Sequence, residues 1–253
     1  KPEHIDLLKT IGQQADKLNL ACYVVGGYVR DRLLNRAFRQ DIDIVCIGSG
    51  MKLAKAVGKK FSVQVHYFKN FGTANLKIKE IEVEFVGARK ESYQTNSRNP
   101  VVENGTLEDD QNRRDFTINA LAIRLNEEGY GDLIDPFGGV SDLDRKIIRT
   151  PLDPDITYSD DPLRMMRAIR FATQLDFMIE RKSMESITRN AERIKIITNE
   201  RIVDELNKIM LSPVPSKGFL LLEKTGLLPY ILPELVALKG IDEIEGQKHK
   251  DNF

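Results

Sequence analysis

Two aspartates one residue apart, Asp41 and Asp43, lie in an alternating apolar stretch. Successive side chains of a β-strand point to opposite faces, so these two carboxylates share one face. Neighbouring carboxylates repel each other, and a shared divalent cation relieves the repulsion. The pair therefore favours a Mg²⁺ site, while a solvated charged strand surface is the ordinary alternative for an isolated Asp-x-Asp.

Shortly before this pair, Gly26 and Gly27 separate a β-rich run from a helical pattern that carries Arg30 and Asp31. Glycines between a strand and a helix let backbone N–H groups approach an anion, and a helix start favours negative charge. Combined with the aspartate pair, this segment predicts nucleotidyl transfer, with the metal held beside substrate phosphates.

A third carboxylate would complete a two-metal site. Glu82 and Glu84 share one face of a later predicted strand, and either of them is a candidate. The alternative is a solvated strand face beside Lys77 and Lys79.

Arg113 and Arg114 stand between a polar segment and an apolar stretch that is predicted to be helical over 115–124. Guanidinium groups form bidentate contacts with phosphates, so this pair is a candidate for binding a triphosphate. A pair of surface arginines is the alternative.

Asp161 and Arg164 are one helical turn apart beside a helix predicted over 162–175. A carboxylate accepts a hydrogen bond from an exocyclic amine, and a guanidinium donates to a ring acceptor. Cytosine and adenine offer both groups, whereas uracil and guanine offer a carbonyl beside an N–H, so this pair could select C and A. The alternative is an ordinary surface ion pair. Arg167 and Arg170 continue the ridge at three-residue steps, where they could hold phosphates or support Arg164.

The elements that position these residues follow from the periodicity of apolar side chains. After a helix over 4–18, the pattern predicts strands over 21–25, 41–47, 62–68, 74–79 and 81–86, with helices over 28–35 and 51–60. Residues 88–112 are polar and almost without periodicity, which predicts a long loop.

From Arg113 onward the apolar residues recur at helical spacing, with further helices predicted over 183–193, 199–210 and 217–225. The chain is therefore interpreted as an α/β domain over 1–150 followed by an all-α domain over 151–253.

Composition excludes several classes of protein. With 253 residues, 41% apolar and 30% charged, the chain is neither low-complexity nor broadly disordered. The 38 basic and 38 acidic residues cancel, no apolar run is long enough to span a bilayer, and two cysteines cannot form a disulfide framework. There is no P-loop or Rossmann glycine motif. A soluble, cytoplasmic protein is expected.

These motifs, taken in order, resemble the class II tRNA nucleotidyltransferases, the family of bacterial CCA-adding enzymes and poly(A) polymerases. The matching segments are Val25–Asp31, Asp41–Asp43, Phe71–Ala74, Glu84–Arg89, Leu107–Asp110, Arg113–Ala120, Asp135–Gly139, Asp160–Ala172 and Asn199–Ile202 with Glu205.

The resemblance implies a head domain with a polymerase-β-like palm of about five strands in a mixed sheet, followed by an all-α neck. It also implies roles for individual residues. Asp41 and Asp43 would bind Mg²⁺ and, with Glu84, form the catalytic carboxylates. The residues implied to bind the nucleotide are Gly26, Gly27, Arg30, Arg114, Asp161, Arg164, Arg167 and Arg170.

The expected activity is Mg²⁺-dependent addition of CMP and AMP, from CTP and ATP, to the 3′ end of tRNA. A poly(A) polymerase of the same family is an alternative, since Val57–Phe61 faintly resembles a segment of such enzymes. CC-only or A-only addition and a non-catalytic tRNA-binding module also stay open. The last residues, 249–253, resemble the opening of an HD-type domain, so we expect a head-and-neck portion of a longer protein.

Overall fold

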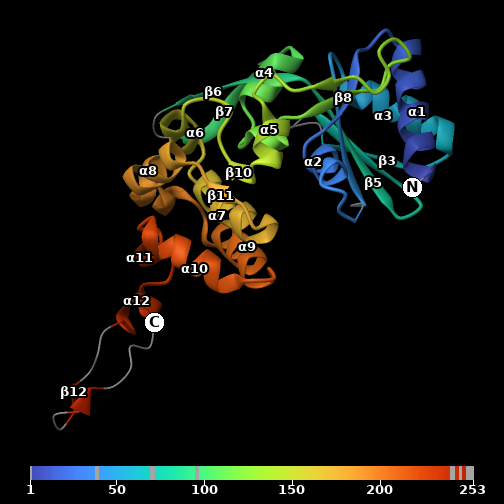
Figure 1. Ribbon diagram of the computed structural model, residues 1–253. Helices are drawn as coiled ribbons and strands as arrows, with labels where there is room; N and C mark the ends of the chain where they lie inside the picture. Colours follow the sequence, from blue (N-terminus) through green and yellow to red (C-terminus); the bar gives the residue numbers. More distant parts are fainter. Residues whose placement is uncertain are drawn as a thin grey trace. The chain divides into compact units, whose positions relative to one another are not determined.

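The computed structural model describes residues 2–37, 40–68, 72–94, 97–239, 243–244 and 247–248 (Figure 1). Phe71 of the resembling segments and the last residues, 249–253, lie outside this part. Contacts divide the chain into an N-terminal unit, Lys1–Arg145 with Arg149–Leu152, and a C-terminal unit, Lys146–Ile148 with Asp153–Phe253.

The N-terminal unit is built on a mixed seven-stranded sheet. Only β2 and β5 are parallel neighbours; the other pairs are antiparallel. In spatial order the strands are β3 (Val65–Phe68), β4 (Thr73–Ile78), β5 (Ile81–Gly87), β2 (Asp41–Cys46), β1 (Cys22–Val25), β8 (Ala122–Arg124) and β9 (Leu133–Ile134). The five strands predicted from periodicity are all present. The sheet exceeds the expected five strands because two short strands, β8 and β9, extend it beyond β1.

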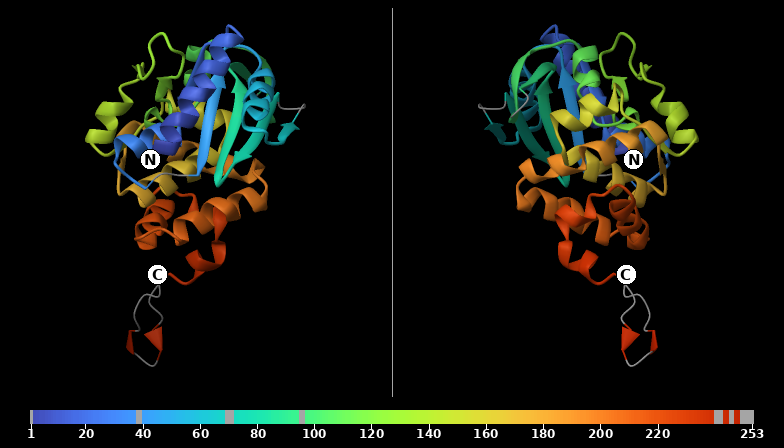
Figure 2. Two further views of the ribbon diagram at one scale, coloured as in Figure 1. Left: turned by 90° about the vertical axis from the view of Figure 1, so that its right-hand side faces the viewer. Right: turned by 90° about the vertical axis from the view of Figure 1, so that its left-hand side faces the viewer.

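Two helices, α1 (Pro2–Lys17) and α3 (Gly50–Phe61), pack against each other and against the sheet. Figure 2 shows α1 lying across the strands. The sheet residues Ile42, Ile44 and Phe85 are almost fully buried on the face opposite to Asp41 and Asp43. This division follows from strand alternation, which sends the apolar residues to the core and the carboxylates to the other face.

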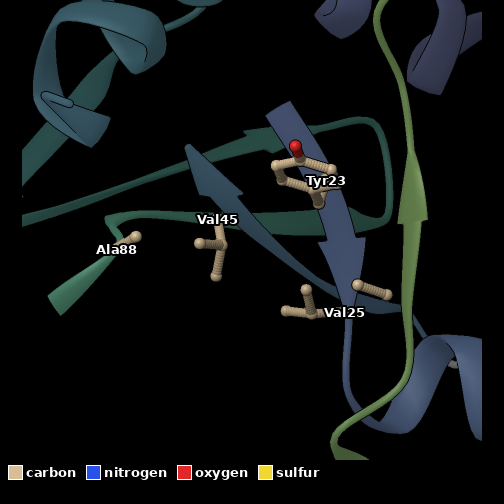
Figure 3. Close-up of a cluster of buried hydrophobic side chains, with 5 residues drawn as sticks. Tyr23, Val25, Val45 and Ala88 are labelled. Atoms are coloured by element: carbon tan, nitrogen blue, oxygen red, sulfur yellow. The ribbon is translucent and has the colours of Figure 1, made fainter. Parts of the chain in front are cut away.

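A small apolar cluster lies on the carboxylate face of the sheet, beside Asp43. Its buried members are Tyr23, Val25, Val45, Ala88 and Ala122. Figure 3 shows the side chains of Tyr23 and Val25 from β1 next to Val45 from β2. Because Val25 is the register partner of Asp43, the cluster anchors the backbone that carries the carboxylate.

The prediction of a long loop over residues 88–112 is wrong. This segment contains an antiparallel pair, β6 (Arg89–Gln94) and β7 (Ser97–Asn104), followed by α4 (Leu107–Asn112). Backbone pairing in a two-stranded ribbon needs no apolar alternation, so periodicity did not indicate it. Helix α4 begins with a capping box, in which Thr106 and Asp109 bond each other's backbone N–H groups.

The prediction of a helix over 115–124 is also wrong. Only Thr117–Asn119 forms a single 3₁₀ turn, and the chain then continues as β8. Its apolar residues suit either conformation, and antiparallel pairing of β8 with β1 selects the strand. The remaining helices of this unit are α2 (Gly27–Leu33) and α5 (Gly139–Asp144).

The C-terminal unit is mainly helical. Its helices are α6 (Pro154–Asp160), α7 (Leu163–Leu175), α8 (Arg181–Asn190), α9 (Asn199–Met210), α10 (Pro215–Lys224), α11 (Leu228–Ile231) and α12 (Pro233–Ala237), with a 3₁₀ helix at Ala191–Ile196. Its short strands, within the residues that the structure describes, are β10 (Ile147–Ile148), β11 (Met178–Ile179), β12 (Glu243–Ile244) and β13 (Gln247–Lys248). Helix α7 is central to the unit and packs against α9, α10 and α6. None of the described helices combines the length and hydropathy that a membrane-spanning segment requires.

Candidate functional site

The parallel pairing of β2 and β5 brings the candidate carboxylates together. Asp41 is the register partner of Glu82, and Asp43 is the register partner of Glu84. Partial burial and the Asp43 carboxylate raise the pKa of Glu84 above its usual range, against the lowering effect of Arg89. The predicted third carboxylate therefore lies within electrostatic reach of Asp43, while Glu82 is the neighbour of Asp41.

The carboxylates on this face of the sheet are suitable ligands for a hard cation such as Mg²⁺. Among the described residues, no three His, Cys, Asp or Glu side chains are gathered closely enough to hold a metal by themselves. Mg²⁺ is commonly held by one or two carboxylates together with water and substrate phosphates. Asp41 and Asp43, whose side chains are exposed on one face of β2, fit that requirement.

Gly26 is close to both a carboxylate and a guanidinium. A methyl group built on its Cα would be 3.3 Å from Arg114 Nη1 and 3.4 Å from Asp43 Oδ2. The backbone also has a φ of 72° at this residue, which favours glycine. The structure therefore brings together three residues predicted from separate motifs, and Gly27 follows directly as the first residue of α2.

The Arg114 side chain is held by a carboxylate that the sequence motifs did not single out. Asp110 on α4 is 0% exposed, and its Oδ2 accepts from Arg114 Nε at 3.0 Å and Nη2 at 2.8 Å. Its Oδ1 accepts from Arg113 Nε at 3.0 Å and Nη2 at 2.6 Å. Burial disfavours the charged form, but Arg114 and Arg113 together lower the pKa of Asp110 below its usual range.

Arg30, which the resemblance implies to bind the nucleotide, is buried and hydrogen-bonded within the N-terminal unit. Its side chain is 2% exposed, its Nε donates to Asp31 Oδ1 at 2.8 Å, and its Nη1 donates to Asn119 Oδ1 at 2.7 Å. Asn119 in turn donates to Asp115, and its backbone carbonyl accepts from Arg114 Nη1 at 3.4 Å. This burial favours a role for Arg30 in tying α2 to the 3₁₀ turn over direct contact with a triphosphate.

In the C-terminal unit, Asp161 lies at a junction instead of inside a helix. Its backbone is extended, because a following proline disfavours the helical conformation, and α7 begins after Pro162. Asp161 Oδ1 accepts from the backbone N–H of Leu163 at 3.2 Å, and Oδ2 is 3.9 Å from Arg201 Nη2. Arg164 is in the first turn of α7, and its backbone N–H bonds the Asp161 carbonyl.

The two further arginines of α7 share an aromatic neighbour. The guanidinium of Arg167 is 5.5 Å from the centre of the Phe171 ring, and that of Arg170 is 4.0 Å from it. Arg167 is half-buried, but Arg170 is buried and its Nε donates to Glu205 Oε2 at 2.5 Å. This geometry favours a supporting role for Arg170 over phosphate contact.

Replacing Glu205 with alanine is expected to reduce the free energy of unfolding by about 3–5 kcal/mol, because Arg170 would remain buried without its carboxylate. Urea unfolding of the chain measures this loss. Glu200→Ala, at an exposed position on the same helix, is the control and should change stability by no more than about 0.5 kcal/mol. Equal effects of the two substitutions would show that the Arg170–Glu205 pair adds no stability.

Sequence reasoning did not assign roles to Asp110, Asn119 or Arg201. Asp110 stands three and four positions before its two arginines, a spacing typical of helical ion pairs, so a local signal was available. The contacts of Asn119 with Arg30 and of Arg201 with Asp161 join distant segments, and no local pattern indicates them.

Comparison with known families gives two matches. A model described as "Poly A polymerase head domain" matches residues 22–149, about half of the chain. A second, described as "Probable RNA and SrmB-binding site of polymerase A", matches residues 176–238.

Curated relatives are similar over nearly the whole chain. The A-adding tRNA nucleotidyltransferase of Geobacter sulfurreducens is 37% identical over 249 residues, which cover 95% of this chain and 28% of that protein. The CCA-adding enzyme of Anoxybacillus flavithermus is 38% identical over 237 residues, which cover 93% of this chain and 55% of that protein. The chain therefore spans between about a quarter and about half of the length of these relatives.

A solved structure has the same fold. It is described as a tRNA nucleotidyltransferase complexed with a primer tRNA and an incoming ATP analog, and it matches with a TM-score of 0.78 at 35% identity. The match covers 90% of this chain and 67% of that one. The predicted α/β head with a mixed sheet, followed by a helical region, is thus confirmed.

Proposed function

The chain belongs to the family of the poly(A) polymerase head domain, and on that premise we propose that it transfers CMP and AMP from CTP and ATP to the 3′ end of tRNA. The observation that carries this proposal is that Asp43 and Arg114 both come close to the Cα of Gly26. A carboxylate for a cation and a guanidinium for phosphate meet there beside a residue without a side chain.

In this proposal, the carboxylates and the arginine at the candidate site of the N-terminal unit have different roles. Asp41 and Asp43 hold Mg²⁺, and Glu84 adds negative charge beside them. When bound, Mg²⁺ neutralises charge on the triphosphate and favours deprotonation of the attacking 3′-hydroxyl. Arg114 donates N–H groups to the triphosphate and stabilises the charge that develops on the departing pyrophosphate.

The C-terminal unit supplies the selection of the base. Asp161 accepts a hydrogen bond from the exocyclic amine of cytosine or adenine, and Arg164 donates to the adjacent ring acceptor. Uracil and guanine present a carbonyl to the carboxylate, so their binding leaves both groups badly paired. The hydrogen bond from the Leu163 N–H to Asp161 Oδ1 restricts the Asp161 carboxylate, which supports its use as an acceptor of defined position.

The free cysteines support a cytoplasmic location for this activity. Cys22 and Cys46 are buried register partners on β1 and β2, and both are thiols. Burial raises the pKa of Cys46 to about 12, so its thiolate is scarce at neutral pH. Unbridged neighbouring cysteines are typical of proteins from reducing compartments.

The test is addition of single nucleotides to three tRNA transcripts that end at the discriminator base, at the first C or at the second C. Each of the four nucleoside triphosphates is supplied alone with Mg²⁺. We expect C on the first two transcripts, A on the third, and no addition of U or G.

Other outcomes identify the alternatives. Addition of C alone or A alone would narrow the activity to one step, in agreement with the names of some relatives. Long A tracts on unrelated RNA would indicate a poly(A) polymerase. Absence of pyrophosphate release with every transcript would leave a non-catalytic tRNA-binding module.

A further inference from the structure

Of the three acidic residues of α4, Asp110 is the one that is buried, with a side chain that is 0% exposed. Glu108 is exposed, and Asp109 caps the start of the helix. Four guanidinium N–H groups point at its two oxygens, two from Arg113 and two from Arg114. Burying a carboxylate costs desolvation free energy. The contacts with its two cationic partners offset this cost only if their geometry is good.

The contact with Asp110 determines which edge of the Arg114 guanidinium is used. Nε and Nη2 both donate to Asp110 Oδ2, so this edge is occupied. Nη1 points the other way, where its neighbours are Gly26, at 3.3 Å from a methyl group built there, and the Asn119 carbonyl at 3.4 Å. The 16% exposure of the Arg114 side chain shows that part of it remains accessible to a ligand.

A planar guanidinium with one edge fixed can present its remaining N–H groups in only one direction. Without the carboxylate, the side chain would have several rotamers, and each bound phosphate would have to restrict them again. An arginine held in advance therefore binds an anion more tightly than the same arginine free to rotate.

We infer that Asp110 is a positioning residue that orients Arg114 toward the triphosphate beside Gly26. This inference rests on the proposed function, because it assumes that a nucleoside triphosphate binds there. Asp110 itself touches no substrate. Its effect passes through Arg114 and is confined to the phosphates of the nucleotide.

The test compares the affinities of CTP and CMP by isothermal titration calorimetry on the full chain at fixed Mg²⁺. The ratio of the two dissociation constants isolates the contribution of the outer phosphates. Asp110→Asn is expected to reduce the preference for CTP over CMP about tenfold, the size of one charge-assisted hydrogen bond. Affinity for CMP should change little.

A double-substitution cycle separates positioning from general support of the fold. In an Arg114→Ala background, Asp110→Asn should have no further effect on the CTP-to-CMP ratio, because its target is absent. The matched control is Asp142→Asn, which alters another buried carboxylate paired with an arginine, Arg149, in the same unit. It should leave the ratio unchanged.

Arg114→Lys provides a second route if Asp110→Asn does not fold. Lysine keeps the charge but lacks the planar fork, so it should lose the CTP preference to a similar degree. Independent effects of Asp110→Asn and Arg114→Ala, or an undiminished ratio in Arg114→Lys, would overturn the inference while leaving the proposed function intact. Failure of the unaltered chain to bind CTP would overturn both.

Discussion

Asp43→Ala is expected to abolish nucleotide transfer, by about a thousandfold or more, while the chain stays folded. The proposed function assigns this carboxylate, which is near Gly26 and Glu84, to Mg²⁺, and a metal ion there would contribute several kcal/mol to transition-state stabilisation. Stability should change little, because the Asp43 side chain is exposed and the apolar cluster beneath it remains. Asp41→Ala should behave in the same way.

Incorporation of labelled CMP and AMP into tRNA measures the activity, and urea unfolding measures the stability. Glu80→Ala is the matched control, since Glu80 is an exposed carboxylate next to β5 that pairs with Lys77 at 3.5 Å. It should retain full activity. Substantial activity in Asp43→Ala would contradict the metal assignment, and loss of folding would show that Asp43 serves the sheet instead.

Asp161→Ala is expected to lower kcat/KM for CTP and ATP. The ratio of these kcat/KM values to those for UTP and GTP should therefore decrease. Each well-formed contact with a base edge contributes about 1–3 kcal/mol of discrimination, so selectivity should fall about tenfold or more. The reason is that only the carboxylate favours an exocyclic amine at that position. Steady-state kinetics with the four nucleotides and a tRNA primer measure the change.

Asp204→Ala is the control for this substitution, because Asp204 is exposed on α9, three residues after Arg201. It should leave base preference unchanged. If Asp161→Ala also keeps the preference, the Asp161 carboxylate has a structural role, through its contacts with the Leu163 N–H and with Arg201. The base would then be selected by other residues.

Local periodicity was sufficient to predict the strands that carry the carboxylates. The alternation of Asp41, Asp43 and the apolar residues between them predicts both the strand and its two faces, and β2 spans Asp41–Cys46 as a result. The apolar stripe over 199–210 likewise predicts α9 with both of its ends. In each case the signal lies within one element, because side-chain direction repeats along the backbone with a fixed period.

Where two conformations suited the same residues, the sequence favoured the wrong one. Residues 115–124 are apolar enough for a helix, but the backbone of Ala122–Arg124 pairs with β1. That pairing depends on a strand about a hundred positions away in the chain, so no window around Ala122 contains the information. Tertiary hydrogen bonds here outweigh local propensity.

The sequence by itself determined the residue types at the site: the aspartates of β2, the glycines at the start of α2 and the arginines after α4. Only the tertiary structure decided which of the candidate guanidiniums are buried. Arg30 and Arg170 belong to segments that resemble nucleotide-binding motifs, yet their partners are Asn119 and Glu205, 89 and 35 positions away. A charged side chain is buried or accessible according to the groups that fold around it, and for these two arginines those groups come from other elements.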